Sequence, residues 1–385
     1  MTGYAEHRRG AHTARWLATV DEGYAQMERY IDAATISIRI ETYVLREEGP
    51  ATRLREALLR ARARNVEVRM LVDAFGAEGV HREFFAPLRG AGAFVAIFNP
   101  QRWLRRSFRN HRKLFACDGE HAVLGGFNIA PEYAGDGVTH GWCDTAVQVS
   151  GPVVRQLEAS FDAMFQLAPF TPQALHRFRR TMRHGVHGAV APDAPVRLLL
   201  TGPGTRGRML RHRLAADLAK ARDVAIASAY FLPSVSFRRL LYAAAKRGKV
   251  QLLLAGRSDV AVARLAAERL YSRLLKRHVR IFEYQPQILH AKLVIIDEIA
   301  YVGSANLDQR SLHINYELLL RFDWPELVAD ARHWFEQSLA SAARIDRAVL
   351  KARRRFWRRL ASWLCYYLLA RLDPLVARRG SRAMS

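Results

Sequence analysis

The sequence carries one six-position pattern twice, and the two copies begin about 180 residues apart. Each copy reads His-x-Lys-x4-Asp, followed by two small residues, one further residue and an asparagine. A single His-x-Lys pair on a strand is usually an ordinary surface pair, but two copies of so long a pattern rarely arise by accident. The chain is therefore expected to contain a duplicated unit. The first copy comprises His111, Lys113, Asp118, Gly125, Gly126 and Asn128, and the second comprises His290, Lys292, Asp297, Gly303, Ser304 and Asn306.

The periodicity around each copy is that of alternating helices and strands. Apolar residues from Trp16 to Ile31 recur at helical spacing, and the strand that follows ends in ETYVL (41–45), which resembles SAYFL (228–232) in the second half. Such alternation is typical of an α/β fold in which helices cover the sheet. The first half predicts helices over 16–31 and 51–64 and strands over 35–45, 66–72 and 94–98; the second predicts helices over 208–222 and 237–247 and strands over 224–231, 250–255 and 279–284.

Four segments follow from this pattern. The two halves are expected to span residues 1–168 and 196–345. Residues 169–195 combine a basic stretch with HGVHGAVAPDAP and are predicted to form a linker. Residues 346–385 are predicted to form a basic amphipathic tail.

The charge of the chain constrains its partners. Sixty Lys and Arg against thirty-six Asp and Glu give a formal net charge of +24, which favours nucleic acid, anionic lipid or another phosphate-rich surface. The 50% apolar composition excludes a disordered chain. Cys117, Cys143 and Cys365 have neither metal-site spacing nor the number for a closed disulfide framework, which suits a reducing cytoplasmic setting.

No segment reads as a membrane anchor or a secretory signal. The N-terminus has no apolar stretch behind its charges. The longest run of low polarity, Leu360 to Ala370, is shorter than the roughly 20 apolar residues that a spanning helix needs. We therefore expect no transmembrane segment.

The residue types of the repeated pattern suit a phosphodiester substrate. Alternate residues of a strand share one face, so each motif histidine points the same way as its lysine. An imidazole can act as nucleophile or as proton donor, and Lys and Asn side chains can hold nonbridging oxygens where negative charge develops. The pattern therefore predicts a phosphoryl-transfer site.

The duplicated pattern resembles the phospholipase D superfamily, from about Trp16 to Ala340. Within that superfamily the chain is most similar to bacterial cardiolipin synthases, in particular to the form without N-terminal transmembrane helices. The two copies differ in one spacing, because the second has one residue fewer between its Asp and its Gly; we place the missing residue in the turn around Glu298. The resemblance lies in LVDAFG (71–76), NHRK (110–113), GGFNIAPEY (125–133), GWCD (141–144) and GSANLDQRSLHINYE (303–317).

The resemblance implies a fold and a mechanism. Two phospholipase D-like halves, each a mixed sheet flanked by helices, would pack about a pseudo-two-fold axis and bring both motifs into one site. His111 would attack phosphorus as a neutral imidazole and form a phosphohistidine, while His290 would be protonated first and donate to the leaving alkoxide. The resemblance also points to an acidic partner for each histidine: Asp144 for His111 and Glu317 for His290.

The remaining motif residues receive supporting roles. Asp118 and Asp297 are expected to support the turn and the neighbouring lysine. No metal ion or other cofactor is implied, because two Lys, a charged His and two Asn already supply a positive field. Residues 202–207 match GxGxxG, but Pro203 removes an amide from any phosphate cradle, so we interpret them as a strand-to-helix turn.

Two basic segments also contain aromatic residues. Before His111, five arginines alternate with apolar residues, which is typical either of a solvated loop or of a funnel that draws anionic headgroups and dips into lipid. Near the C-terminus, an apolar stripe with basic flanks predicts a helix that lies in a membrane interface or docks on a protein surface. The first segment contains Arg102, Trp103, Leu104, Arg105, Arg106, Phe108, Arg109 and Arg112; the stripe contains Phe356, Leu360, Trp363, Leu364, Tyr367 and Leu368.

The leading hypothesis is a transphosphatidylase that converts two phosphatidylglycerol molecules into cardiolipin and glycerol. Its expected partner is an anionic phospholipid membrane, with the protein peripheral on the cytoplasmic face of the inner membrane. A phospholipase D-type phosphodiesterase or a nuclease that uses water as acceptor is the alternative, with nucleic acid the less favoured partner. A catalytically idle membrane scaffold is disfavoured because both motifs are intact. The preferred donor and acceptor and the oligomeric state are left open.

Overall fold

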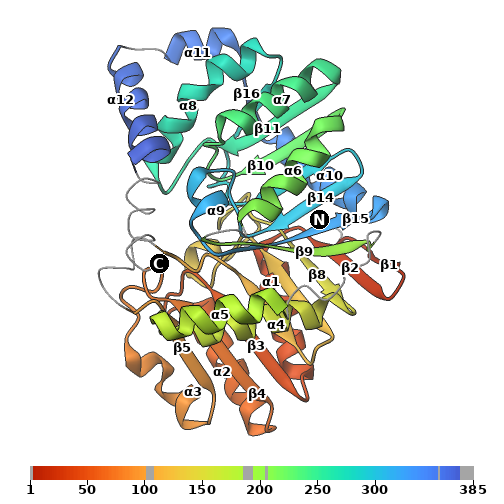
Figure 1. Ribbon diagram of the computed structural model, residues 1–385, viewed down its shortest axis with the longest axis vertical. Helices are drawn as coiled ribbons and strands as arrows, with labels where there is room; N and C mark the ends of the chain where they lie inside the picture. The colour runs from red at the N-terminus through yellow and green to blue at the C-terminus, as the bar shows by residue number, and fades with distance from the viewer. Residues whose placement is uncertain (1–2, 101–107, 185–193, 204–206, 354–355, 373–385) are drawn as a thin grey trace.

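Two eight-stranded mixed sheets form the fold, one from each half of the chain (Figure 1). The computed structural model describes residues 3–100, 108–184, 194–203, 207–353 and 356–372. The first sheet has the order β1-β2-β8-β7-β6-β3-β4-β5. Its strands are β1 (Glu6–Arg9), β2 (His12–Leu17), β3 (Ser37–Thr42), β4 (Glu67–Asp73), β5 (Phe94–Phe98), β6 (Leu114–Cys117), β7 (His121–Gly125) and β8 (Ala146–Ser150).

The second sheet repeats this arrangement. Without the edge strands β1 and β16, the order β9-β15-β14-β13-β10-β11-β12 matches β2-β8-β7-β6-β3-β4-β5 strand for strand. In each sheet three neighbouring strands run parallel: β3, β4 and β5 in the first sheet and β10, β11 and β12 in the second. The hairpin that follows each motif histidine, β6–β7 or β13–β14, joins these strands in the antiparallel sense. The expected duplicated α/β fold is confirmed. The second set is β9 (Val196–Thr201), β10 (Asp223–Ser228), β11 (Lys249–Ala255), β12 (Arg280–Tyr284), β13 (Lys292–Ile296), β14 (Ile299–Gly303), β15 (Glu317–Asp323) and β16 (Ala342–Ile345).

Helices cover both faces of each sheet. The outer face of the first sheet packs against α1, α2 and α3, and that of the second packs against α6, α7 and α8. Between the sheets lie α4 and α10, each of which also contacts a strand of the other half. Their bounds are α1 (Val20–Ala33), α2 (Pro50–Ala63), α3 (Ala86–Gly90), α4 (Val153–Leu167), α6 (Gly207–Lys220), α7 (Val235–Arg247), α8 (Ala261–Lys276) and α10 (Pro325–Ala340).

The first helix begins later than its apolar spacing predicts. Trp16 lies in β2, opposite Val147 of β8, and its side chain is buried between the sheets. The helix begins at Val20, because Thr19 accepts a hydrogen bond from the Glu22 N–H (3.2 Å) and caps the first turn. The helical spacing of Trp16 is therefore accidental. Trp16 belongs to a strand, in which side chains alternate between the two faces of the sheet.

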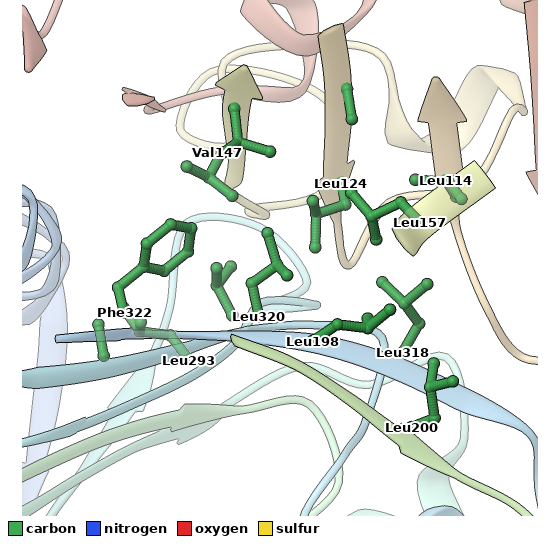
Figure 2. Close-up of a cluster of buried hydrophobic side chains, with 14 of the residues drawn as sticks. Leu114, Leu124, Val147, Leu157, Leu198, Leu200, Leu293, Leu318, Leu320 and Phe322 are labelled. Carbon is green, nitrogen blue, oxygen red and sulfur yellow. The ribbon is translucent and has the colours of Figure 1, made fainter. Parts of the chain in front are cut away.

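A shared hydrophobic core joins the two halves (Figure 2). On β15, Leu318 and Leu320 face the first half, whereas Leu319 between them faces the outer helices of the second half. The strand is thus buried on both faces, which explains its continuous apolar sequence. This core fixes the position of one half against the other. Leu114, Leu124, Val147 and Leu157 of the first half lie opposite Leu198, Leu200, Leu293, Leu318, Leu320 and Phe322 of the second (Figure 2).

The spacing difference between the two motif copies falls in a turn, as expected. The β6–β7 turn has three residues, 118–120, whereas the β13–β14 turn has only Asp297 and Glu298. Because the deletion lies outside the strands, it leaves their side-chain faces unchanged. The placement of Asn306 therefore matches that of Asn128.

The segments between and after the halves contain further helices. Residues 169–195, expected to be a linker, include α5 (Pro172–His184), whose Phe178 is buried and packs edge-on against the Tyr316 ring at 5.7 Å. The GxGxxG match does connect a strand to a helix, β9 to α6, although its residues 204–206 lie outside the described part. The tail contains α11 (Arg347–Arg353) and α12 (Phe356–Tyr367). None of the described helices is both long and apolar enough to cross a bilayer.

Candidate active site

The chain around His111 is held by the opposite half of the molecule. The His111 N–H donates to the carbonyl of Tyr316 (3.0 Å), and the Tyr316 N–H donates to the carbonyl of Arg109 (3.0 Å). These two bonds form a short parallel bridge between the entrance of β6 and the entrance of β15. The first motif histidine is thus fixed next to a strand of the second half.

The chain around His290 is held in the same way by the first half. The Cys143 N–H donates to the carbonyl of Ile288 (2.8 Å), and the His290 N–H donates to the carbonyl of Cys143 (2.7 Å). The two bridges are related by the duplication. Together they place both motif histidines along the line where the halves meet.

Each bridge brings a carboxylate of one half to the histidine of the other half. Glu317 Oε2 lies 3.0 Å from His111 Nδ1, and Asp144 Oδ2 lies 2.8 Å from His290 Nδ1. The prediction that each histidine pairs with the carboxylate of its own half was therefore wrong. The reason is the backbone bridge, since Tyr316 and Cys143 each immediately precede a carboxylate. An ionised carboxylate at Nδ1 holds the proton there and leaves Nε2 free for chemistry.

The residue after each motif glycine is small because a buried carboxylate packs against it. A Cβ atom at Gly126 would lie 2.5 Å from both carboxylate oxygens of Asp144, so only glycine fits there. In the second half Ser304 takes this position, and its Oγ donates to Glu317 Oε2 (2.6 Å). The Gly–Gly and Gly–Ser pairs thus serve the same purpose, which is to seat a fully buried carboxylate.

The two lysines are buried next to their histidines. Lys113 Nζ donates to the carbonyl of His111 (2.7 Å) and lies 5.2 Å from the centre of the Tyr43 ring. Lys292 Nζ lies 2.7 Å from Nδ1 and 3.1 Å from Nε2 of His290. Burial lowers the pKa of both lysines, and that of Lys292 falls to about 8.

Charges from both motifs act on the pKa values of the two histidines. Burial and then the nearby charge of Lys113 lower the pKa of His111 well below its usual range, and Lys292 and His290 of the other half add to this effect. Burial and then Lys292 lower the pKa of His290 to about 4. Without substrate both imidazoles are therefore neutral at pH 7, which suits His111 as a nucleophile. Burial also raises the pKa of Glu317 to about 8, against the opposing charge of Lys113.

The motif aspartates do not lie with the histidines. Asp118 accepts hydrogen bonds from the backbone N–H groups of residues 35–37 (2.8–2.9 Å), and Asp297 accepts from those of Arg222 and Asp223 (3.0 and 2.8 Å). Both stand at the far end of the hairpin, about 16 Å along the strand from the motif lysine. They therefore tie the turn to the entrance of β3 or β10, as expected, but they do not support the lysines.

Asn128 acts through an aromatic pair that the motif analysis did not single out. Its Oδ1 accepts from the Val44 N–H (3.0 Å), and its Nδ2 donates to the Tyr133 hydroxyl (2.7 Å). That hydroxyl lies 3.4 Å from His290 Nε2, and the rings of Tyr133 and Trp142 lie 5.0 and 5.4 Å from the His290 ring. The second copy has Ser311 and Asn315 at these positions. A comparison of the two copies could have revealed this aromatic pair, because the second copy lacks it.

The described end of the basic segment before His111 packs into the fold. Arg112 is buried and pairs with the buried Glu41 (3.0 Å), because it alternates with His111 and Lys113 and faces the other way. Phe108 is also buried, and Arg109 lies over the Phe75 ring at 4.1 Å. Arg102, Trp103, Leu104, Arg105 and Arg106 lie outside the described residues.

Comparison with known proteins places these features in a family. The family described as "Cardiolipin synthase, PLD-like domain" matches residues 27–165 and 214–339, one range in each half, which confirms the two phospholipase D-like halves. The cardiolipin synthase of Geobacillus sp. (strain WCH70) is 32% identical over 87% of this chain and 68% of its own length. Cardiolipin synthase A of Pseudomonas fluorescens is 32% identical over 86% of this chain and 69% of its own length. The chain thus spans about two thirds of these relatives.

Solved structures share the fold at low sequence identity. The phosphatidylserine synthase of Haemophilus influenzae aligns with a TM-score of 0.74 at 11% identity and covers 94% of both chains. The polyphosphate kinase of Porphyromonas gingivalis aligns with a TM-score of 0.56 at 17% identity, over 85% of this chain and 47% of the kinase. At such identities the likeness concerns the fold alone.

The position of Asp118 predicts that it stabilises the fold without taking part in chemistry. Asp118→Asn should lower the free energy of unfolding by about 1–2 kcal/mol, because an amide accepts fewer of the three backbone hydrogen bonds. Asparagine tolerates the positive φ of 55° at this turn. Urea denaturation and turnover below the unfolding transition measure the two effects. Turnover should stay within about threefold of wild type, whereas His111→Asn should abolish it; equal losses in both variants would contradict this placement.

The lowered pKa of Lys292 predicts an alkaline limit to activity. Because the ammonium loses its proton as pH rises through about 8, kcat/KM on a soluble diester such as bis(p-nitrophenyl) phosphate should fall above that pH. Lys292→Arg stays charged, so its profile should remain flat to higher pH although its rate is lower. Lys249→Arg, at the start of β11, is the control. An unchanged alkaline limb in Lys292→Arg would contradict the assignment.

Proposed function

Since the chain belongs to the cardiolipin synthase family with phospholipase D-like domains, and so to the phosphatidyltransferases of the phospholipase D superfamily, we propose that it transfers a phosphatidyl group between phospholipids through a phosphohistidine. With two phosphatidylglycerol molecules the products are cardiolipin and glycerol. The observation that carries the proposal is the pair of crossed contacts, His111 with Glu317 and His290 with Asp144. They hold both imidazoles by Nδ1, so each Nε2 points away from its carboxylate; that of His290 lies 3.1 Å from Lys292 Nζ and 3.4 Å from the Tyr133 hydroxyl.

In the first step His111 is the nucleophile. Ionised Glu317 accepts the Nδ1–H of His111, so the Nε2 lone pair attacks phosphorus and a P–N bond forms. Burial favours the neutral form of this carboxyl in the empty site, whereas the charge of Lys113 favours the ionised form. The P–O bond to the donor headgroup breaks, and protonated His290 gives its proton to the leaving alkoxide. Lys113 and Lys292 stabilise the negative charge on the nonbridging oxygens.

In the second step the roles of the two histidines reverse. Neutral His290 takes the proton from a headgroup hydroxyl of a second phospholipid as its oxygen attacks phosphorus. The P–N bond breaks, and His111 returns to its neutral form. Over one cycle the phosphatidyl group passes from the donor to the acceptor, and the proton given to the leaving group is replaced by the one taken from the acceptor.

The substrate itself supports the protonation that the first step needs. His290 is neutral in the empty site because burial and Lys292 lower its pKa to about 4. A bound phosphodiester adds a negative charge between the two lysines, which raises the pKa of the nearby imidazole. Substrate binding and uptake of the catalytic proton are therefore coupled.

The C-terminal helix supports docking on an anionic membrane surface. One side of α12 is held to α8 by the Arg358–Glu268 ion pair (2.6 Å). The other side exposes Trp357, Trp363 (50% exposed) and neighbouring leucines of the apolar stripe. An exposed face with aromatic residues on a chain of net charge +24 fits the interface of an anionic bilayer. We place the protein there as a peripheral enzyme on the cytoplasmic face of the inner membrane.

The proposed reaction predicts matched products. Wild-type protein incubated with phosphatidylglycerol vesicles should form cardiolipin and glycerol in equal amounts, measured by lipid mass spectrometry and a glycerol assay. With phosphorus-labelled lipid, the denatured protein should retain label in an acid-labile, alkali-stable bond, as a phosphoramidate requires. His111→Asn should lose both the product and the label. Phosphatidic acid without cardiolipin would instead identify a hydrolase, and neither product would refute phosphatidyl transfer.

The membrane proposal predicts that the exposed side of α12 controls lipid binding. The double variant Trp363→Glu/Leu364→Glu should reduce the fraction of protein that floats with phosphatidylglycerol vesicles by about tenfold. It replaces apolar side chains that would be buried in the bilayer with negative charges that anionic lipid repels. The control is Ile36→Glu, which changes an apolar side chain that is 67% exposed in the first half. Equal flotation of the double variant and wild type would contradict this docking surface.

A further inference from the structure

We propose that Asp259 and Tyr230 form the acceptor-binding end of the active site, where they recognise the hydroxyl groups of a small polyol headgroup. The inference rests on the proposed phosphatidyl transfer and identifies the part of that site which distinguishes an alcohol acceptor from water.

The chemistry places both alcohols on the His290 side. In an in-line displacement the leaving oxygen departs on the side of phosphorus opposite His111. His290 must reach that oxygen to protonate it, and it must later reach the entering hydroxyl to deprotonate it. The headgroup that leaves and the headgroup that enters therefore occupy the same space, and residues around His290 decide which alcohol fits there.

The strand register brings Tyr230 to this position. Ser228 of β10 pairs with Lys292 of β13 in an antiparallel ladder. Tyr230 follows β10 by two residues and His290 precedes β13 by two, so both lie beyond the same end of this ladder. The Tyr230 hydroxyl donates to the carboxylate of Asp259, 2.8 and 2.7 Å from its two oxygens. Asp259 is exposed, so its carboxylate keeps acceptor capacity for a ligand.

Electrostatics agrees with this placement. The charge of Asp259 acts on the pKa of Lys292 and on that of Tyr133, and each of these side chains lies beside the His290 ring. The nearby Asp308 serves a different purpose, since it caps α9 (Gln309–His313) by accepting from the Ser311 N–H (2.7 Å). Asp259, in contrast, does not cap a helix.

A third acceptor group lies next to Tyr230. The Phe231–Leu307 bridge brings Asn306 alongside Tyr230. Asn306 is only 2% exposed, and its Oδ1 has no hydrogen-bond partner among the described residues. The matching oxygen of Asn128 accepts from the Val44 N–H. A buried acceptor without a donor is costly, so Asn306 Oδ1 points to a ligand that brings an O–H group.

Among the described residues of the first half, the positions that match Tyr230 and Asp259 carry neither a hydroxyl nor a carboxylate. ETYVL and SAYFL, compared in the sequence, are displaced by one residue: the bridges match Leu45 with Phe231, so the counterpart of Tyr230 is Val44 rather than Tyr43. Asp259 lies four residues after the end of β11, and the residue four after the end of β4 is Ala77. Tyr230, Asp259 and Asn306 thus offer an alcohol with several hydroxyls its acceptors beside His290, in keeping with His111 as the nucleophile.

The partition of the covalent intermediate tests the proposal. Phosphatidylglycerol vesicles are incubated with labelled free glycerol, and two products are measured: labelled phosphatidylglycerol, from transfer to glycerol, and phosphatidic acid, from transfer to water. Their ratio is set after the phosphohistidine has formed, so it does not depend on donor binding or on the amount of folded enzyme. Asp259→Ala should lower this ratio about tenfold, as expected for one lost charge-assisted hydrogen bond, and Tyr230→Phe should lower it less.

Controls separate the possible outcomes. Asp259→Asn keeps the side-chain size and should also lower the ratio, which covers the case in which the alanine variant does not fold. Asp32→Ala removes an exposed carboxylate that pairs with Arg60 on the far side of the first half and should leave the ratio unchanged. A wild-type ratio in both Asp259 variants would overturn the acceptor assignment while phosphatidyl transfer stands. Absence of both products in wild type would overturn the proposed function and this inference with it.

Discussion

The whole site depends on two short backbone bridges between the halves, at Asn110–Tyr316 and Cys143–Leu289. Each bridge fixes a histidine of one half beside the residue that precedes a carboxylate of the other. Neither half alone therefore contains a histidine with its acidic partner. The leucine-rich core between the sheets holds the halves in the register that makes both bridges, so this packing sets the geometry of the pocket (Figure 2).

The duplication has diverged where the two steps of the reaction need different surroundings. Beneath the first motif lies a buried polar network of Glu41, Asn110 and Arg112, whereas the second motif has Leu289 and Ala291 beside its histidine. The rings of Tyr133 and Trp142 lie beside His290, whereas the ring of Tyr43 lies 4.8 Å from that of His111. Loss of either partner of the Arg112–Glu41 pair would leave a buried charge uncompensated, so the two residues depend on each other. Two copies of one motif have thus become two unlike halves of one pocket.

The sequence predicted the features that depend on local pattern. Strand alternation, helix spacing and the repeated motif gave the two sheets and the six motif positions, and even the deleted residue was placed in the correct turn. The crossed carboxylates could not be found in this way, because Asp144 and Glu317 reach their histidines through contacts between distant segments. The burial of Arg112 could have been predicted, since it alternates with His111 and Lys113 in the segment that leads into β6. Periodicity misled at Trp16, where strand pairing outweighed an accidental helical spacing.

The empty pocket favours binding of an anion because its charges are poorly solvated. Burial shifts the pKa values of its ionisable side chains toward fewer charges: those of both lysines and both histidines fall, and that of Glu317 rises. A phosphodiester reverses this shift for the cations, because its negative charge stabilises both ammonium groups and a protonated imidazole. A neutral ligand gives no such compensation. The same desolvation that makes the free site costly therefore provides both selectivity for a phosphate group and the proton that its cleavage requires.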